Sequence, residues 1–463
     1  MRDARITRLL TATLLSTSLV CHSAWATDLL EVYEAAKTSD AVVGAARAGY
    51  AATKEAVPQA RSALLPSVNA SANTSWTERE FPGSVNPNTG TGVPDQEFND
   101  HGWNAQLRAP LLNMGSWFGV GSAKASVKAA GHDLAATEQQ LIVRVVEAYL
   151  NVLRAQDLLD STSAEEAAVK RQLEQVQQRF DVGLVAITDV LESQAAYDNA
   201  AVRRIQADGD HDIFFETLST LSGESYDQLF RLSDSLPILN PDPIDEQVWV
   251  DTALSSNLNI RTAQEQLTAA RRNVRARRSG HLPTIDATIT EVHSVTGSPN
   301  FFGADTTDQR VYGLELNIPI YNGGVVRSQS KQARAEQEQA RELLLNQQRT
   351  VTRDTRNLYR AVATDVVRVK ARLKAIKSAQ SALDATETGY EVGTRNIVDV
   401  LQAQQRLFSS QFDYADSRYN YVINLMRLKQ AAGSLNEADL TELNNFIDPS
   451  NPVVRIVTMT GQK

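Results

Sequence analysis

The sequence has 463 residues, a formal net charge of −9 at pH 7 and a single cysteine, Cys21. An acidic chain is a poor ligand for nucleic acid, and one cysteine excludes both a disulfide framework and a cysteine-based metal site. The six histidines are scattered, and the chain has no HExxH, GxSxG, GxGxxG or phosphate-loop motif. The residues therefore give no support for catalytic residues, a metal site or a cofactor.

The first 26 residues have the features of a secretory signal peptide. A basic start with Arg2, Arg5 and Arg8 precedes an apolar stretch, 9–20, and Ala24-Trp25-Ala26 is a typical cleavage site. Cleavage removes three Arg, one Asp and the only cysteine, and moves the formal net charge from −9 to −11. Because no later stretch is apolar enough for a transmembrane helix, the mature chain is either soluble in the periplasm or a β-barrel protein of the outer membrane.

The mature chain begins with helical periodicity and then changes to strand periodicity. Apolar residues at helical spacing predict a helix over 28–64, which ends near Pro66. Apolar and polar residues then alternate in four stretches: 68–76, 103–109, 285–289 and 312–318. These stretches predict two pairs of strands, each pair joined by a polar loop, 81–99 or 297–308.

Strands with one apolar and one polar face fit a membrane barrel with a wet lumen. Trp76, Trp103 and Tyr312 are then expected at the lipid interface. A soluble sheet half buried on a layer of helices is the alternative, because the alternation is weak in each strand.

Long helices follow each pair of strands. The stretches 116–180 and 325–390 lack proline and predict helices of roughly 100 Å. Apolar residues in the second fall at steps of three and four, as in a coiled-coil seam, so these helices should pack side by side or form a plain stalk. Turns at 181–184 and 391–394 lead to returning helices, 191–221 and 401–428. We expect Thr188 or Asp189 to cap the first returning helix and Asn396 to cap the second.

The chain contains one structural unit twice. Residues 179–191 return as 389–401, 61–68 match 278–285, and 110–115 match 319–324. We therefore expect four parts: a signal peptide (1–26), a first repeat of helix, two strands and a long helical hairpin (27–240), a second repeat in the same order (241–440), and a C-terminal periplasmic tail (441–463).

Four strands cannot close a barrel, for which roughly eight are needed. Open edges cannot lie in lipid, because their backbone groups would be unpaired. Two chains would supply eight strands and three would supply twelve, and only the larger number leaves an open lumen. A trimer with long helices hanging from its barrel would form a tunnel.

Five arginines precede the third predicted strand: Arg271, Arg272, Arg275, Arg277 and Arg278. The dipole of a helix favours cations at its C-terminal end. We interpret the cluster as a solvated helix end, with an anion filter lining the tunnel as the alternative.

Several long motifs resemble the TolC family of outer membrane efflux proteins, over essentially the whole mature chain. They are Gln178–Asp189, His281–Pro283, Ile318–Gly324, Gly389–Tyr390, Val392–Arg395 and Ile397–Leu401. The resemblance implies a mainly α-helical fold with a membrane β part and an internal duplication. Long antiparallel coiled helices would form a periplasmic α-barrel, and four strands per chain would contribute to a shared twelve-strand trimeric outer-membrane β-barrel.

The resemblance also implies a function and a location in the outer membrane, with a large periplasmic portion. The protein would be the exit duct of tripartite efflux and type I secretion systems, and would pass small molecules or proteins through a gated tunnel. The expected assembly is a homotrimer in outer-membrane lipid with a periplasmic adaptor and an inner-membrane RND, ABC or MFS transporter. A periplasmic coiled-coil adaptor or spacer without a membrane barrel is the alternative.

The same resemblance assigns roles to residues at the predicted helix tips. Tyr390 would bond Asp189, and Arg395 would bond Thr188 and Asp189, to hold the tunnel entrance shut. Gln172 would be a further polar member of this gate network.

A pore constriction is implied at Asp399, where a ring of three carboxylates would attract cations. Gln402 lies at the position where the family has a second ring of aspartates. Glu192, the counterpart of Gln402 in the first repeat, would restore the missing charge. Six residues in the tip turns would dock the adaptor: Val182, Gly183, Leu184, Val392, Gly393 and Thr394.

Overall fold

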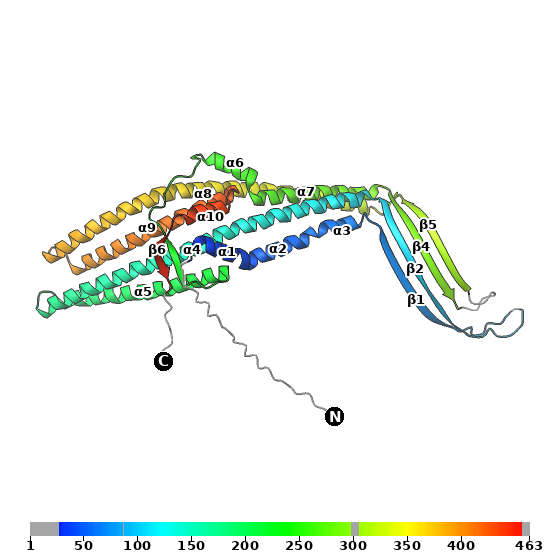
Figure 1. Cartoon of the computed structure of the whole chain (residues 1–463), viewed down its shortest axis with the longest axis horizontal. Coiled ribbons are helices and arrows are strands. Elements are labelled where there is room, and N and C mark those ends of the chain that lie inside the picture. Colours follow the sequence, from blue (N-terminus) through cyan, green and yellow to red (C-terminus); the bar gives the residue numbers. More distant parts are fainter. Residues whose placement is uncertain (1–26, 87, 298–304, 456–463) are drawn as a thin grey trace, which may run out of the picture.

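The structure is a computed structural model that describes residues 27–86, 88–297 and 305–455. The predicted signal peptide and the last eight residues lie outside this part. A β-sheet occupies one end of the elongated molecule and long helices form the rest (Figure 1).

The sheet has four antiparallel strands in the order β1-β2-β4-β5. They are β1 (Ser67–Arg79), β2 (Gln96–Leu112), β4 (Thr284–Thr296) and β5 (Asp305–Asn317). The register brings one apolar residue from each strand into a single row: Val68, Leu107, Ile289 and Tyr312. The two outer strands, β1 and β5, each have an edge without a partner strand in the described part of a single chain.

Both hairpins extend farther into the predicted polar loops than expected. β2 begins at Gln96 rather than after Asn99, because these residues pair with Arg79 and Trp76 of β1. β5 begins at Asp305, and residues 298–304 lie outside the described part. Strand pairing, which local alternation does not encode, therefore determines where the loops begin and end.

Two helices of 68 and 67 residues run from the sheet to the far end: α4 (Met114–Asp181) and α8 (Val325–Glu391). Each is followed by a tight turn and a shorter antiparallel helix, α5 (Ile187–Ser222) or α9 (Ile397–Ala432). At 1.5 Å per residue, α4 is about 100 Å long. The two predicted helical hairpins are thus present at the predicted places.

The prediction of one continuous helix over 28–64 is wrong. The segment is three helices, α1 (Leu29–Ser39), α2 (Ala41–Lys54) and α3 (Ala56–Ser62). Asp40 causes the first break, because its backbone is extended and its side chain accepts the Val43 N–H at 2.8 Å, which caps α2. The Arg144 guanidinium of α4 donates to both carboxylate oxygens of Asp40, at 2.9 and 3.0 Å. Burial acts to raise the pKa of Asp40, but these bonds hold it below its usual range.

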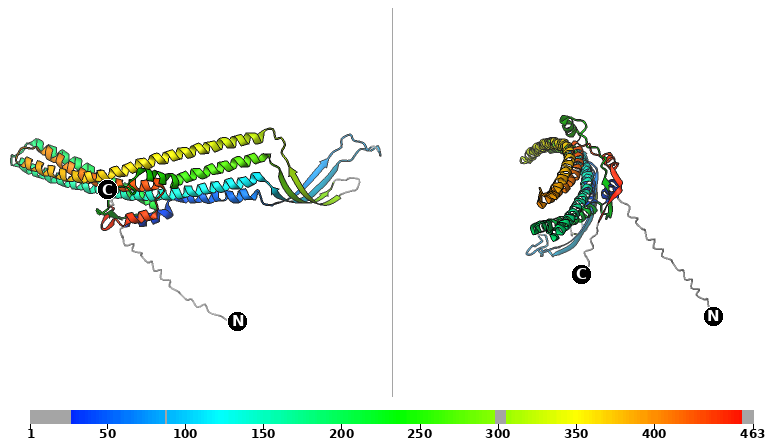
Figure 2. Two further views of the ribbon diagram at one scale, coloured as in Figure 1. Left: turned by 90° about the horizontal axis from the view of Figure 1, so that it is seen from above. Right: turned by 90° about the vertical axis from the view of Figure 1, so that its left-hand side faces the viewer.

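Near the sheet, α7 (Leu258–Arg278) lies between α4 and α8, and a short 3₁₀ helix, η1 (Ser279–His281), connects it to β4. The helices form a curved layer, and red β6 lies on its convex side (Figure 2). In a closed tunnel the convex side faces outwards, so this picture distinguishes the outer face of the molecule from the face that lines the lumen.

A small layer covers the middle of the long helices on the convex side. It contains β3 (Gln228–Leu232), α6 (Glu246–Ser256), α10 (Glu437–Asn444) and β6 (Ile447–Val454), and β3 pairs with β6. The Tyr149 hydroxyl of α4 is 2.7 Å from the Phe230 carbonyl oxygen and 3.3 Å from that of Thr27. Neither β3 nor β6 was predicted from the sequence, because both are short and they lie far apart in the chain.

Candidate functional site at the helix tips

The two long hairpins end in turns of the same form. Gly183 and Gly393 have φ angles of +77° and +78°, a region that suits glycine after a helix. In the first turn the Leu184 N–H donates to the Arg179 carbonyl oxygen at 2.8 Å, and in the second the Thr394 N–H donates to the Gly389 carbonyl oxygen at 2.8 Å. The sequence repeat therefore encodes one turn geometry twice.

These turns carry apolar side chains in open solvent. The exposed fractions of Val182, Leu184 and Val392 are 70%, 74% and 69%. They lie at the end of the molecule farthest from the sheet (Figure 1). Nothing lies within 4 Å of a Cβ atom placed on either turn glycine. The turns thus present accessible apolar side chains on a defined backbone.

A small hydrophobic cluster joins the two hairpins directly behind the turns. Its buried members come from α4, α5 and α9: Val176, Val190, Ile397 and Val400. Tyr390, near the end of α8, packs against this cluster. All four tip helices therefore share one core, and a movement of one hairpin disturbs the other.

Tyr390 occupies an unusual position in this core. Its hydroxyl is buried and has no hydrogen-bond partner among the described residues, while the Arg179 guanidinium lies 5.3 Å from the ring centre. Tyr390, Gln172 and Arg179 line one groove of about 460 Å³ between α4 and the α8–α9 pair. A buried hydroxyl without a partner costs stability, so a bond supplied by a rearrangement or a neighbouring chain would be strongly favoured.

Arg395 and Asp399 lie together at the start of α9. Asp399 forms a capping box with Asn396: its backbone N–H donates to the Asn396 side chain at 2.8 Å, and its carboxylate accepts the Asn396 N–H at 3.4 Å. The prediction that Asn396 caps this helix is confirmed. An Arg395 nitrogen is 3.8 Å from the Asp399 carboxylate. Gly389 allows this arrangement, because a Cβ atom there would be 2.8 Å from Arg395 Cγ.

Two of the three pore candidates share a second groove, of about 680 Å³. Asp399 and Gln402 line it, with Arg395 and Arg406 among the other lining residues. Glu192 is exposed on α5 and lines neither of the two tip grooves. The structure therefore brings Asp399 and Gln402 together and leaves Glu192 apart from them in a single chain.

The predicted cap by Thr188 or Asp189 is wrong. Ala186 is the N-cap residue of α5 and makes no side-chain capping bond, because the helix already begins at Ile187. Asp189 consequently lies in the first turn, where the helix dipole still favours its charge. Within the described residues of one chain, no hydrogen bond joins Tyr390 to Asp189. The gate bonds thus stay a prediction about the assembled channel.

Sequence reasoning missed Arg179 and Arg406. Arg179 begins the repeated motif, at the position that Gly389 occupies in the second copy. This difference between the two copies could have indicated the role of Arg179. The second copy needs glycine next to Arg395, whereas the first copy has an arginine that reaches the Tyr390 ring.

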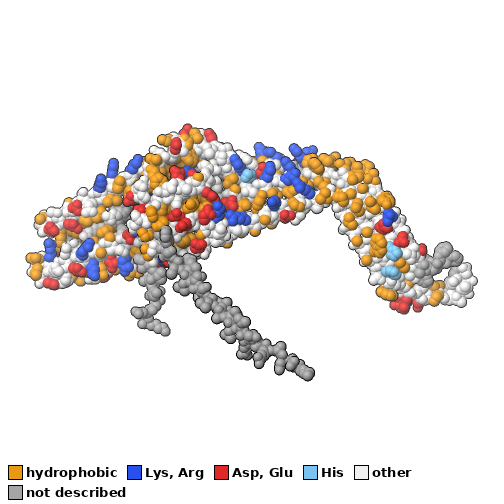
Figure 3. Space-filling model, viewed as in Figure 1, with side chains coloured by type: hydrophobic (Ala, Val, Ile, Leu, Met, Phe, Trp, Pro, Cys, Tyr) orange, Lys and Arg blue, Asp and Glu red, His pale blue; other side chains and the backbone are white. Residues whose placement is uncertain are grey.

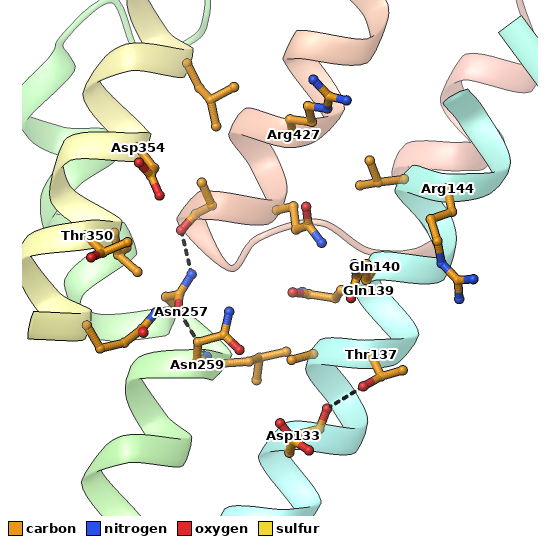
Figure 4. A pocket seen from close by; sticks show the side chains of 18 of the residues that line it. Asp133, Thr137, Gln139, Gln140, Arg144, Asn257, Asn259, Thr350, Asp354 and Arg427 are labelled. Atoms are coloured by element: carbon orange, nitrogen blue, oxygen red, sulfur yellow. Dashed lines mark hydrogen bonds between the residues drawn. The ribbon is translucent and has the colours of Figure 1, made fainter. Parts of the chain in front are cut away.

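A third groove lies in the middle of the molecule, where α9 ends and α7 begins between α4 and α8. Its volume is about 740 Å³ (Figure 4). The Asn257 side chain donates to the Ala431 carbonyl oxygen at 2.9 Å across this joint. Gly433 has a φ angle of +71°, and a Cβ atom there would be 2.6 Å from the Ser256 backbone. The groove marks a joint between two helices and belongs to the architecture of the tunnel wall.

In the described part of the chain, no helix is long and apolar enough to cross a membrane. The same residues hold no group of three or more His, Cys, Asp or Glu side chains arranged for a metal ion.

The fold and the tips can be compared with known proteins. Residues 32–224 and 249–434 match the family model described as Outer membrane efflux protein. The chain belongs to the outer membrane efflux protein family. Outer membrane protein TolC of Vibrio cholerae serotype O1 is 35% identical over 424 residues, which cover 91% of this chain and 94% of the relative. TolC of Escherichia coli strain K12 is 36% identical over 443 residues, with coverage of 92% and 86%.

A more distant relative and a solved structure agree with this membership. The alkaline protease secretion protein AprF of Pseudomonas aeruginosa is 27% identical over 444 residues, covering 94% of this chain and 91% of the relative. A crystal structure of CusC has a TM-score of 0.76 at 16% identity, covering 89% of this chain and 93% of that chain. This last likeness concerns the fold alone.

Membership of the efflux protein family decides between the readings that the sequence left open. The chain is an outer-membrane exit duct for efflux and type I secretion, with a periplasmic tunnel. The family forms trimeric channels that work with efflux and secretion machinery, and it is not a family of enzymes. Four strands from each of three chains make the shared barrel. The reading as a spacer without a membrane barrel is therefore wrong.

Proposed function

We propose that the two tip turns dock a periplasmic adaptor and that the tips of three chains close the tunnel entrance. The observation that carries this proposal is the exposure of Val182, Leu184 and Val392 at the periplasmic end. Exposed apolar side chains on a defined turn are typical of a protein contact surface. Gly183 and Gly393 supply the backbone conformation that presents these side chains.

The proposed duct carries out no catalysis and has no energy source of its own. The chain has no phosphate-binding motif. We infer that an inner-membrane transporter of the RND, ABC or MFS class supplies both substrate and energy. The adaptor would join this transporter to the tips.

In the proposed closed state, Tyr390 bonds Asp189, and Arg395 bonds Thr188 and Asp189, within or between chains. Gln172 lines the same groove as Tyr390, which supports a polar network at this place. The buried Tyr390 hydroxyl without a partner in the single chain leaves one donor available for such a bond. Release of these bonds would open the entrance.

We further propose that Asp399 forms the charged constriction of the closed entrance. Its position beside Gln402 in an open groove supports accessibility to ions. Gln402 contributes no charge, so the ring would carry one carboxylate per chain unless Glu192 approaches from a neighbouring chain. Asp399 also belongs to the capping box of α9, which ties the constriction to the start of the helix that must move.

The docking proposal is tested by removing the apolar tip surface without straining the backbone. The triple variant Val182→Ser, Leu184→Ser, Val392→Ser should abolish export by a reconstituted pump assembly. Trimer formation and conductance in planar bilayers should stay normal. Val202→Ser is the matched control, because Val202 is an exposed valine on α5 outside the turn. Normal export by the triple variant would rule out docking through these side chains.

A second pair of variants tests the turn backbone. Gly183→Val and Gly393→Val place a branched side chain at a positive φ angle, with a cost of about 1–3 kcal/mol each. Nothing lies within 4 Å of the added Cβ atom, so loss of export reports the turn conformation. Wild-type export by both variants would show that the turn conformation is not needed for docking.

A further inference from the structure

A group of cationic side chains lies just below the sheet. This basic band consists of Lys124 and Lys128 on α4 and Arg271, Arg275 and Arg278 on α7, all of them exposed. Among the described residues, none of the five forms an ion pair. Lys and Arg side chains gather over α7, next to the hydrophobic surface around the start of the sheet (Figure 3). Five cations without an ion-pair partner in one place create a positive potential that attracts an anionic ligand.

The arginines of the band face away from the lumen. The Arg261 side chain donates to the Ser255 carbonyl oxygen at the end of α6, so Arg261 points to the convex side. Arg275 follows two heptads later and therefore keeps the same side of the helix. Arg271 and Arg278 lie four residues before and three residues after Arg275, which puts them on the same broad face.

Two other sides of α7 are covered by neighbouring helices. Ile260 packs with Val351 of α8 on one side, and the Ala269 carbonyl oxygen accepts the Ser122 hydroxyl of α4 on the other. Arg277 comes two residues after Arg275, about 200° around the helix. It consequently faces the lumen, so among Arg271, Arg275, Arg277 and Arg278 the alternative of a tunnel-lining anion filter applies to Arg277 alone.

The lysines of the band lie on the same outer face. The Tyr149 hydroxyl points to the Phe230 carbonyl oxygen of β3, in the layer on the convex side. Lys128 precedes Tyr149 by 21 residues, or three heptads, and Lys124 lies one turn farther towards the sheet. α4 and α7 run side by side, so the two lysines and three arginines form one surface.

The apolar face of the sheet shows where the hydrocarbon layer of the membrane lies along the molecule. Alternate exposed residues of β5 and its extension are apolar: Tyr312, Leu314, Leu316, Ile318 and Ile320. The row ends at an ion pair, in which Arg310 lies 2.7 Å from Glu291. The ten residues from Arg310 to Ile320 span about 33 Å along the chain and about 23 Å in height at a tilt of 45°. Barrels present an apolar band about 25 Å tall to lipid, so the hydrocarbon ends close to Ile320.

The junction between sheet and helices is therefore at the lipid–water interface. Ile320 is 92% exposed and Trp117, at the start of α4, is 65% exposed. Tryptophan is enriched at this depth in membrane proteins. Arg278 lies six residues before the first residue of β4, and Lys124 lies ten residues after the start of α4, or about 15 Å below it. Long cationic side chains reach several ångströms towards headgroups, so the band borders the phosphate layer.

We propose that the basic band binds the phosphate groups of anionic phospholipids in the periplasmic leaflet of the outer membrane. Three chains would repeat it around the trimer, directly below the barrel. The proposal rests on the outer-membrane location and goes beyond the duct function. Each cation near an anionic bilayer raises the affinity about fivefold, so three arginines together contribute on the order of 100-fold at low salt.

The test uses purified trimer in vesicles with spin-labelled phosphatidylglycerol or phosphatidylcholine. Electron paramagnetic resonance gives the ratio of the two association constants. We expect wild-type trimer to prefer phosphatidylglycerol, and the triple variant Arg271→Gln, Arg275→Gln, Arg278→Gln to lower the ratio by more than fivefold. High salt should lower the wild-type ratio in the same direction. The triple change to lysine should keep the preference.

The matched control removes three lysines from the far part of α8, as Lys370→Gln, Lys374→Gln, Lys377→Gln. These exposed residues are unpaired among the described residues, and Lys370 lies 45 residues, or about 68 Å, from the start of α8. Arg277→Gln controls for a cation on the lumen side of the same helix. Both controls should keep the wild-type ratio. Heat-modifiable mobility on gels verifies that each variant is a trimer.

Three results would overturn the proposal. The ratio of the arginine-to-glutamine variant could stay within fivefold of wild type, or the distal lysine variant could lose the preference equally. Displacement of labelled phosphatidylglycerol by excess inorganic phosphate at constant ionic strength would identify a site for free phosphate instead of lipid.

Discussion

Replacing Tyr390 with Phe and Arg395 with Ser is expected to raise the single-channel conductance of the trimer in planar bilayers. The phenylalanine ring keeps the packing against Val176 and Val400 and the contact with Arg179, so the change removes a hydroxyl without creating a cavity. Arg395 is largely exposed, and its nitrogen is as far as 3.8 Å from the Asp399 carboxylate. The loss of Arg395 therefore removes little stabilising energy within one chain. Any large effect must come from bonds that exist in the closed trimer.

The expected shift in free energy between the closed and the open state follows from the hydrogen bonds of the Tyr390 hydroxyl. A hydrogen bond to a charged partner contributes about 1.5–3 kcal/mol, and three copies in a trimer that opens as a unit contribute roughly 4.5–9 kcal/mol. A change of about 5.5 kcal/mol moves a two-state equilibrium from 1:99 to 99:1. Loss of the Tyr390 bond alone would therefore convert a closed entrance into a mostly open one.

Tyr419→Phe is the matched control for this experiment. The Tyr419 hydroxyl donates to Asp157 at 2.6 Å in the middle of the molecule, far from the tips. Its removal should lower the heat stability of the trimer and leave conductance unchanged. The gate reasoning is refuted if intact Tyr390→Phe, Arg395→Ser trimers conduct like wild type, or if Tyr419→Phe raises conductance equally.

Three further outcomes are expected. Asp399→Asn should weaken block of the single-channel current by divalent cations and Gln402→Asp should strengthen it, whereas block unaffected by Asp399→Asn would place the constriction elsewhere. Burial lowers the pKa of His211, so unfolding takes up a proton below about pH 6.5. The thermal midpoint of the trimer should therefore fall on acidification through that pH, and less so in His211→Leu; equal falls would exclude His211 as the cause. Gly389→Ala should displace Arg395 and raise conductance, while Gly44→Ala, which meets nothing within 4 Å, should not; equal conductance of the two variants would contradict this role of Gly389.

The candidate site was partly predictable, because the tip motif occurs twice. The repeat located both turns and the capping role of Asn396, since turn and cap geometry depends on neighbouring residues. It did not reveal that the Tyr390 hydroxyl is buried without a partner, or that Arg179 contacts this ring. Both facts depend on how α4 packs against α8, which no local pattern encodes.

The sequence by itself determined the long helices, the four strands and their apolar face. Periods of two and of three to four residues are local properties, and they decide which side of an element avoids water. Duplication and strand number also required an oligomer, because four strands leave open edges.

Only the tertiary structure decided how distant segments meet. The pair between Asp40 and Arg144 joins residues 104 positions apart in the chain, and the pairing of β3 with β6 joins two short strands at least 200 residues apart. The outward direction of Arg271, Arg275 and Arg278 likewise follows from the contacts of α7 with α4, α6 and α8. The sequence showed a cluster of charge, whereas packing determined the side of the tunnel that it faces, because a helix exposes only the sides that its neighbours leave uncovered.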